Sequence, residues 1–575
     1  MEDRIGKNLQ SEFARSFVPS DAQLGSKSEV LALFGSLEKR ELKDREQIES
    51  WLEDWSELSA ALSEEEAVRY IRMTCRTDDE QREKEFIHFV EEISPLLKNK
   101  SFELSKKLLD APSRKELPAD RYFVLLRDLE NHVEIFREEN VPLQTEEEKL
   151  SQGYQKLIGS LTVEHDGEEK TLQQMGKYLE YQDRSLRQEV WEKVTARRLR
   201  EREKLDEIFD KMLELRKKIA ANAGFDNYRD YAFRMRGRFD YGVADCEKFH
   251  AAVEKVVVPL YRELQEKRQK EMGLDNLRPW DLRPDAKGRP PLQPFSKVDE
   301  LVDGCRKIFD RLDPALGTWF KFMADHELLD LESRKGKAPG AYSHGLQEMR
   351  LPFIFANAVG VDHDVYTLLH ESGHSFHTLE ARKEPLVFYR HAPIEFCEVA
   401  SMSLEFLGAD HLDVFYSAED KARSRREHLE SVAFLFSWIA TVDAFQHWIY
   451  THPGHGPEER AKAWVELRKR FGGTEDWSGF DEARRFEWHR QLHIFEIPFY
   501  YIEYGIAQMG ALQVWQRSRK DKTQALRDYR KALALGGSKK LPELFEAAGI
   551  KFDMSEKTLD PLIDRVKREL DMSAE

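Results

Sequence analysis

Two histidines stand four residues apart in the run His370-Glu371-Ser372-Gly373-His374. On a helix, residues with this spacing point to the same side, one turn apart. Their imidazoles can therefore hold one metal ion. Glu371 follows the first histidine and can reach a water at that ion. This H-E-x-x-H arrangement is typical of zinc hydrolases, in which one helical turn supplies two ligands and a general base.

The residues around this run predict a buried amphipathic helix over 365–381. Its apolar side chains are Val365, Leu368, Leu369 and Phe376. Two histidines and a glutamate on such a helix would be costly to desolvate without a bound partner. The alternative is a surface helix with solvated side chains. Gly373 lowers helix propensity, which makes sense if backbone or substrate passes close to it.

A catalytic zinc usually takes a third protein ligand. Position 380 holds no histidine, and Cys397 is less suited to a hydrolase, so a carboxylate is the natural choice. The candidates are Glu380, Glu384, Glu395, Glu398 and Glu405. Glu398 and Glu405 lie seven apart on one face of an apolar helix, where acids need a partner. We assign Glu398 to the metal and Glu405 to a ligand imidazole; the alternative is that both are solvated.

The other histidines near this helix receive weaker assignments. His377 lies three residues beyond His374 and is expected to pack beside the site rather than to act as a fourth ligand. No helical spacing places His363 or His391 on the same helix face as His370 and His374, so no role is expected for them.

Most of the chain has helical periodicity with dense Glu, Lys and Arg faces. Helices are expected at 46–59 and 64–73, and two long ones at about 172–196 and 201–222. A hairpin is expected over 161–172, because Asp166-Gly167 separates two short extended runs. The best strand candidates in the second half are 328–332 and 351–356. Pro352 favours an edge strand for the latter, which an extended peptide could pair with.

The composition limits the classes of partner. Of the 575 residues 34% are charged, and the net charge of −17 argues against nucleic acid and anionic membranes. The four cysteines lie far apart with no C-x-x-C pair, so we expect a reduced cytoplasmic protein and no cysteine metal ligands. We find no signal peptide and no run long enough to span a membrane. The sequence does not indicate the oligomeric state.

Several motifs together resemble the thimet oligopeptidase and oligoendopeptidase F family of zinc peptidases, and the oligoendopeptidase F branch most closely. The matching segments are Pro352–Asn357, His370–His374, Phe396–Ser401, Gly340–Ser343, Val442–Gln446, Pro498–Tyr501 and the hairpin at 161–172. The resemblance extends over about residues 115–570. It implies that the Glu of the F-x-E-x-x-S segment, Glu398, is the third ligand of one Zn²⁺ per chain.

The resemblance also implies a mainly α, zincin-like fold in two lobes that enclose a deep channel. A small β-sheet would lie beside the active-site helix. We expect an N-terminal helical lobe over 1–200, which acts as a lid, and a catalytic lobe over 201–575. Short peptides would enter such a channel, and folded proteins would not.

Further site residues follow from the edge strand and the resemblance. The expected substrate contacts are Phe355, Ala356, Asn357, Gly340, Tyr342 and His344, although an ordinary loop role is equally open for His344. Hydrolysis builds negative charge on the carbonyl oxygen, which a Tyr or His commonly stabilises. The segment 493–505 resembles the family's substrate-contacting loop and helix. Its expected catalytic residues are Tyr504 and Tyr500, followed by His493, and a buried aromatic cluster is the alternative.

The expected function is a zinc-dependent endopeptidase that cleaves short unstructured oligopeptides, with Glu371 as general base. One alternative is a zinc carboxypeptidase of related helical fold. It would need a fixed cation for the substrate carboxylate, for which Arg350 and Arg390 are candidates. The other alternative is a catalytically inactive, peptide-binding homologue.

Overall fold

The computed structural model describes residues 5, 9 and 12–572. The chain is mainly α-helical and forms two compact units, each built from three separate segments. Unit 1 holds residues 1–134, 292–424 and 507–552, and unit 2 holds residues 135–291, 425–506 and 553–575. The boundary expected near residue 200 therefore falls inside unit 2, between two of its helices.

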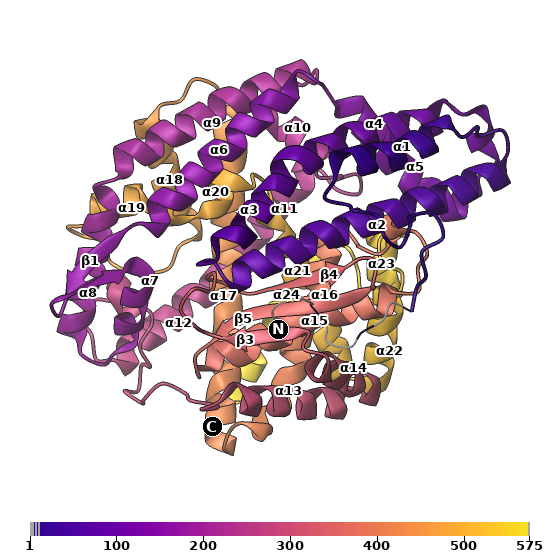
Figure 1. Cartoon of the computed structure of the whole chain (residues 1–575). Coiled ribbons are helices and arrows are strands. Elements are labelled where there is room, and N and C mark those ends of the chain that lie inside the picture. Colours follow the sequence, from indigo (N-terminus) through magenta and orange to yellow (C-terminus); the bar gives the residue numbers. More distant parts are fainter. Residues whose placement is uncertain (1–4, 6–8, 10–11, 573–575) are drawn as a thin grey trace. The chain divides into compact units, whose positions relative to one another are not determined.

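Unit 1 contains a helical N-terminal part and a part in which helices pack on a three-stranded sheet (Figure 1). Its main elements are α1 (Lys27–Lys39), α2 (Arg45–Cys75), α3 (Glu80–His88), α4 (Ser94–Asp110), α5 (Ala119–Ile135), α13 (Val298–Leu312), α14 (Pro314–Asp325), β3 (Leu329–Glu332), β4 (Tyr342–Leu346), β5 (Leu351–Ala358), α15 (Asp362–Ala381), α16 (Ile394–Ala409), α22 (Lys522–Leu533) and α23 (Leu541–Ala547).

Unit 2 is helical apart from one hairpin. Its main elements are α6 (Asn140–Gly159), β1 (Thr162–His165), β2 (Glu168–Thr171), α7 (Leu172–Met175), α8 (Arg184–Leu199), α9 (Arg202–Asn222), α10 (Tyr228–Met235), α11 (Val243–Ala252), α12 (Val258–Glu271), α18 (Pro457–Phe471), α19 (Asp481–Arg485), α20 (Leu492–Glu496) and α24 (Glu556–Met572). Two further helices, α17 (Ala418–Thr451) and α21 (Ile502–Ser518), have residues in both units, and α5 of unit 1 ends at the first residue of unit 2, Ile135.

The hairpin at 161–172 is confirmed. β1 and β2 pair antiparallel, and Asp166 and Gly167 between them both have positive φ, at 57° and 76°. These are the angles that a tight Asp-Gly hairpin turn needs. The segments 46–59 and 64–73 are helical as predicted, although both belong to the single helix α2. The prediction of one helix over about 172–196 is wrong, because the helix is interrupted between α7 and α8.

The three-stranded sheet has the order β3-β5-β4, with β3 parallel and β4 antiparallel to β5. β5 is therefore the central strand, and the prediction of an edge strand at 351–357 is wrong. Pro352 is tolerated because β3 pairs with β5 only from Ile354 onward, so on the β3 side Pro352 faces no strand. The edge strand on the other side is β4.

Helices pack on both faces of β4. Ser343 faces α15, where its hydroxyl lies 3.0 Å from the Ser375 hydroxyl. Tyr342 points to the opposite face, where its hydroxyl lies 2.6 Å from that of Thr74 on α2. This alternation is the period of two expected for a strand, and it decides which β4 side chains approach the helix of the H-E-x-x-H run.

A buried apolar core holds α1, α2, α4 and α5 together, and Trp51 and Trp55 are its largest members. Leu386 and Tyr389, from the segment after α15, belong to the same core. The backbone N–H of Val387 donates to the Ser56 hydroxyl at 2.7 Å. The N-terminal helices of unit 1 thus fix the segment 384–391, which leads into α16.

Candidate metal centre

Helix α15 carries His370, Glu371 and His374, and it extends over 362–381, close to the predicted range. α16 packs against it, and Gly373 faces the backbone of α16 directly. Because no side chain stands between the helices there, α16 comes close enough for Glu398 to reach both histidines.

The ligand atoms of His370, His374 and Glu398 all lie within 4.8 Å of one another. The Oε2 atom of Glu398 is 3.3 Å from Nε2 of His370 and 3.6 Å from Nε2 of His374. Metal–ligand bonds of about 2.0–2.2 Å in a tetrahedral site put neighbouring ligand atoms roughly 3.3–3.6 Å apart. The carboxylate of Glu398 therefore already stands at the separation from each imidazole that a tetrahedral ion requires.

Two hydrogen bonds orient these groups. Glu405 Oε1 lies 2.7 Å from Nδ1 of His370, and the Ser401 hydroxyl donates to Glu398 Oε2 at 3.0 Å. The Glu405 contact leaves Nε2 of His370 to face Glu398, as a metal-ligating imidazole requires. Burial alone would raise the pKa of Glu398, but the neighbouring His374 and His370 outweigh it and lower this pKa to about 2.

Glu371 lies beside the three ligands and is only 8% exposed. Burial raises the pKa of its carboxyl group to about 7, against the effect of the nearby His370 and of a hydrogen bond from the Ser343 backbone N–H. Ser343 belongs to β4, so the edge strand meets the helix of the H-E-x-x-H run at this glutamate. A carboxylate in such a setting suits proton transfer near neutral pH.

The other carboxylates considered as ligands are placed differently. Glu380 pairs with Arg530, and Glu384 pairs with Arg121. Glu395 is buried in the first turn of α16, and among the described residues it is not in the ligand group that contains Glu398.

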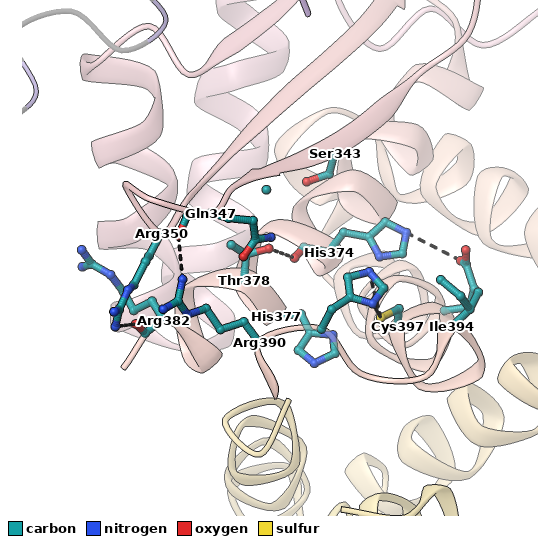
Figure 2. A pocket seen from close by; sticks show the side chains of 13 residues that line it. Ser343, Gln347, Arg350, His374, His377, Thr378, Arg382, Arg390, Ile394 and Cys397 are labelled. Carbon is teal, nitrogen blue, oxygen red and sulfur yellow. Dashed lines mark hydrogen bonds and ion pairs between the residues drawn. The ribbon is translucent and has the colours of Figure 1, made fainter. Parts of the chain in front are cut away.

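A cavity of about 160 Å³ opens beside two of the three ligands, His374 and Glu398. Three arginines line it as well: Arg350, Arg382 and Arg390. Figure 2 shows Arg350 and Arg382 at one side of the cavity, with His374 and Cys397 toward the other.

The sequence suggested Arg350 and Arg390 as cations for a substrate carboxylate but not Arg382. It could not show that the three arginines line one cavity, because they come from a turn, a helix end and a loop. His391 also lines the cavity, although no role was expected for it. The buried His377, expected to pack beside the site, is another lining residue, and burial lowers its pKa to about 3.

Of the expected substrate contacts in β5, Phe355 and Ala356 are buried and Asn357 is half-buried. Phe355 is fully buried and stacks on Tyr342 with ring centroids 4.8 Å apart, and Ala356 is 5% exposed. The Asn357 amide donates to the carbonyl oxygens of Ala338 and Gly340 at 2.8 and 2.9 Å. Asn357 therefore holds the loop before β4, whose backbone turns at Gly340 with a φ of +95°.

Tyr342 and His344 lie on the α2 side of the sheet, and both rings contact Tyr70, with centroids 5.4 and 6.1 Å away. Burial lowers the pKa of His344. The β4 residues that face α15 are instead Ser343 and Gly345. Ser343 was missed as a candidate residue, and only the alternation of β4 beside Tyr342 could have indicated it.

His493, Tyr500 and Tyr504 lie in unit 2 and form one cluster. The His493 ring centroid is 5.8 Å from that of Tyr500 and 6.0 Å from that of Tyr504, and the two tyrosine rings are 5.3 Å apart. Burial, followed by the charge of Arg236, lowers the pKa of His493 to about 4. The three residues expected to act on the substrate together are thus neighbours.

A mainly helical chain with an H-E-x-x-H helix, a downstream glutamate helix and a small sheet beside them defines a zincin-like fold. The sequence model of peptidase family M3 matches residues 177–562 of this chain. The sequence model of the peptidase M3 N-terminal domain matches residues 28–136. This chain therefore belongs to peptidase family M3, as its resemblance to oligoendopeptidase F predicted.

Named relatives agree with this assignment. The chain is 26% identical over 254 residues to an oligoendopeptidase F homolog of Borreliella burgdorferi, which covers 42% of each protein. It is 27% identical over 236 residues to oligopeptidase PepF of Bacillus subtilis, 39% of this chain and 34% of the relative. These alignments therefore span less than half of either curated relative. A structure of PZ peptidase A with an inhibitor superposes with a TM-score of 0.87 at 30% identity, covering 98% of this chain and 99% of that one.

None of the described helices is long and apolar enough to cross a membrane. The cytoplasmic location expected from the cysteine pattern stays a prediction.

Proposed function

We propose that this protein is a zinc-dependent endopeptidase that cleaves internal bonds of short, unstructured oligopeptides. The observation that carries the proposal is the group His370, His374 and Glu398, whose ligand atoms lie within 4.8 Å of one another beside the buried carboxyl group of Glu371. Two imidazoles and one carboxylate are a donor set that catalytic zinc sites use, with one position left for water.

When bound there, zinc would polarise the scissile carbonyl group and lower the pKa of a water molecule. Glu371 takes the proton from the attacking water and passes it to the leaving amine. Glu405 fixes the tautomer of His370, and Ser401 holds one oxygen of Glu398. Tyr504, Tyr500 and His493 are the proposed donors to the developing oxyanion.

The substrate backbone is proposed to pair with β4 rather than with β5, because β4 is the edge strand and runs past Glu371 at Ser343. A peptide needs an extended backbone for this pairing. A folded protein would first have to unfold locally, at a cost of up to about 5–15 kcal/mol for a whole domain. Short unstructured peptides avoid that cost.

The proposal is tested with quenched fluorescent peptides of increasing length beside one globular protein in folded and denatured form. We expect turnover of short peptides that depends on about one zinc per chain at the H-E-x-x-H site. Of the two forms of the globular protein, we expect the denatured form to be cleaved and the folded form to stay intact. Rapid internal cleavage of the folded protein would contradict the proposed substrate class, although not the zinc chemistry. A metal-loaded chain that binds peptides without cleaving them would instead favour the inactive homologue.

One specific observation favours the carboxypeptidase alternative: arginines line the cavity beside His374 and Glu398. Two of the three arginines already bind the backbone. Arg390 donates to the carbonyl oxygens of Gln347 at 2.6 Å and Pro385 at 2.7 Å, and Arg350 donates to the Arg382 carbonyl oxygen at 3.0 Å.

Peptides with a free or an amidated C-terminus separate the two activities. An endopeptidase cleaves both forms of one sequence at similar rates. A carboxypeptidase cleaves the free form but not the amidated form, because the fixed cation then has no carboxylate to bind.

A further inference from the structure

Unit 2 contains a second group of potential metal ligands. Cys246 and His250 stand four residues apart on α11, and Asp443 and His447 stand four residues apart on α17. With this spacing, each helix presents two side chains on one face, one turn apart. Two such pairs that face each other can surround a single ion.

Three of these side chains form one compact group, and His250 joins it through its contact with Asp443. The ligand atoms of Cys246, Asp443 and His447 lie within 4.8 Å of one another. Oδ2 of Asp443 is 3.3 Å from Nε2 of His447 and 2.8 Å from Nε2 of His250. The first distance equals the separation of two ligand atoms in a tetrahedral site whose metal–ligand bonds are about 2.0 Å long. The second is the distance of a hydrogen bond, so the His250 ring has to move away from Asp443 for both groups to bind one ion.

The cluster is deeply buried. Cys246 and Asp443 are 0% exposed, His250 is 5% exposed and His447 is 9% exposed. Phenylalanine rings surround the imidazoles. The ring centroid of His447 lies 5.3 Å from that of Phe499, and the centroid of His250 lies 6.2 Å from that of Phe249. A carboxylate is costly in such apolar surroundings unless a positive charge compensates it.

Hydrogen bonds within the protein do not satisfy this cluster. Among the described residues, Oδ1 of Asp443 and both ring nitrogens of His447 are buried and accept or donate no hydrogen bond. Buried polar atoms without a partner are rare in native proteins, and each one needs an explanation, such as a bound ion. Here the atoms without partners are those of two potential ligands.

We propose that Cys246, His250, Asp443 and His447 bind a second divalent metal ion, of the zinc class, in addition to the one at the H-E-x-x-H site. A thiolate, a carboxylate and two neutral imidazoles are all ligands that zinc accepts. Their two negative charges cancel the charge of a divalent ion, so the buried group becomes neutral as a whole. Four protein ligands in a buried group are typical of a structural site.

Binding releases one proton, because the thiol of Cys246 must give up its hydrogen to form the bond between sulfur and metal. Burial, followed by the charge of Asp443, raises the pKa of this thiol well above its ordinary value. Since the site is closed to solvent, we expect the ion to enter during folding and to link α11 to α17 within unit 2.

Cobalt substitution tests the proposal, because a bond from thiolate to Co²⁺ gives a charge-transfer absorption in the near ultraviolet. The group at the H-E-x-x-H site contains no cysteine, so this absorption reports on Cys246 alone. The full chain is produced in zinc-depleted medium with added cobalt, and its cobalt content and spectrum are measured. We expect two cobalt ions per chain and the thiolate band.

Matched variants locate the signal. Cys246→Ser should abolish the band and reduce the cobalt content to one per chain, whereas Cys397→Ser should keep both the band and two ions. Glu398→Gln should lose the other ion and keep the band. Cobalt content of one per chain without a thiolate band in the unaltered protein would overturn the proposal, and so would a band that survives Cys246→Ser.

Discussion

A Cβ atom on Gly373 would lie 2.5 Å from the Cα atom of Ser401 and 2.8 Å from the carbonyl oxygen of Ala400. No side chain fits in that space. Gly373 directly precedes His374 on α15, and Ser401 lies three residues after Glu398 on α16. The contact between these helices therefore sets how closely Glu398 approaches His370 and His374.

We predict that Gly373→Ala forces the helices apart and weakens metal binding. Overpacking of a rigid backbone contact costs about 1–3 kcal/mol, and a ligand that moves away loses its bond. Metal content after dialysis and the melting temperature should both fall. Gly35→Ala is the control, because Gly35 lies on α1 in the same unit and a Cβ atom added there would have no heavy atom outside its own helical turn within 4 Å. A Gly373→Ala protein with normal stability and metal content would contradict this prediction.

Glu398→Gln should lose most of the bound metal at the H-E-x-x-H site, and Glu395→Gln should keep it. The two residues lie on the same helix, but only Glu398 belongs to the ligand group with His370 and His374. Removal of Glu405 should be milder. Glu405→Gln is expected to lower the affinity by about 10–100-fold, because the imidazole loses its orienting partner but keeps its bond. Titration with a competing chelator ranks the three variants.

Glu371→Gln should keep the metal and lower turnover by at least ~10²-fold. The amide has the size of the carboxylate but cannot accept the proton. Peptide affinity measured with the inactive variant should stay close to that of the unaltered protein. Near-normal turnover would exclude Glu371 as the base and transfer that role to another group.

Glu64 on α2 accepts hydrogen bonds from the backbone N–H groups of Glu348 and Met349, both at 2.8 Å. It thereby holds the turn that connects β4 to β5, next to Arg350. Burial raises its pKa from 4.5 to about 7, and the charge of Glu348 adds to this shift, while the two N–H bonds and Arg15 oppose it.

Because the folded state of Glu64 keeps a proton that the unfolded state releases, its contribution to stability decreases as the pH rises from 4.5 to about 7. Glu64→Gln, which stays neutral, should therefore gain in melting temperature over the unaltered protein across this window. The gain should be larger at about pH 8 than at about pH 5. Glu53→Gln, on the exposed side of the same helix, is the control. A difference that does not vary with pH would contradict the prediction.

The sequence by itself determined the features that depend on near neighbours in the chain. Four-residue spacing placed His370 and His374 on one face of α15, and Asp166-Gly167 specified the hairpin. A seven-residue spacing on an apolar helix indicated Glu398 and Glu405, which the structure places 3.3 and 2.7 Å from opposite nitrogens of His370. Such patterns can be predicted because helix and strand periods are fixed by the backbone.

Only the tertiary structure decided the features that depend on which segments meet. Pro352 suggested an edge strand, but strand order follows from pairing partners distant in the chain, and the edge proved to be β4. The arginines of the cavity come from three different elements. Cys246 and Asp443 are almost two hundred residues apart, and each looks unremarkable without the other. Helix and strand periods relate only residues that are near in the chain, so the packing of α11 against α17 alone brings these ligand atoms together.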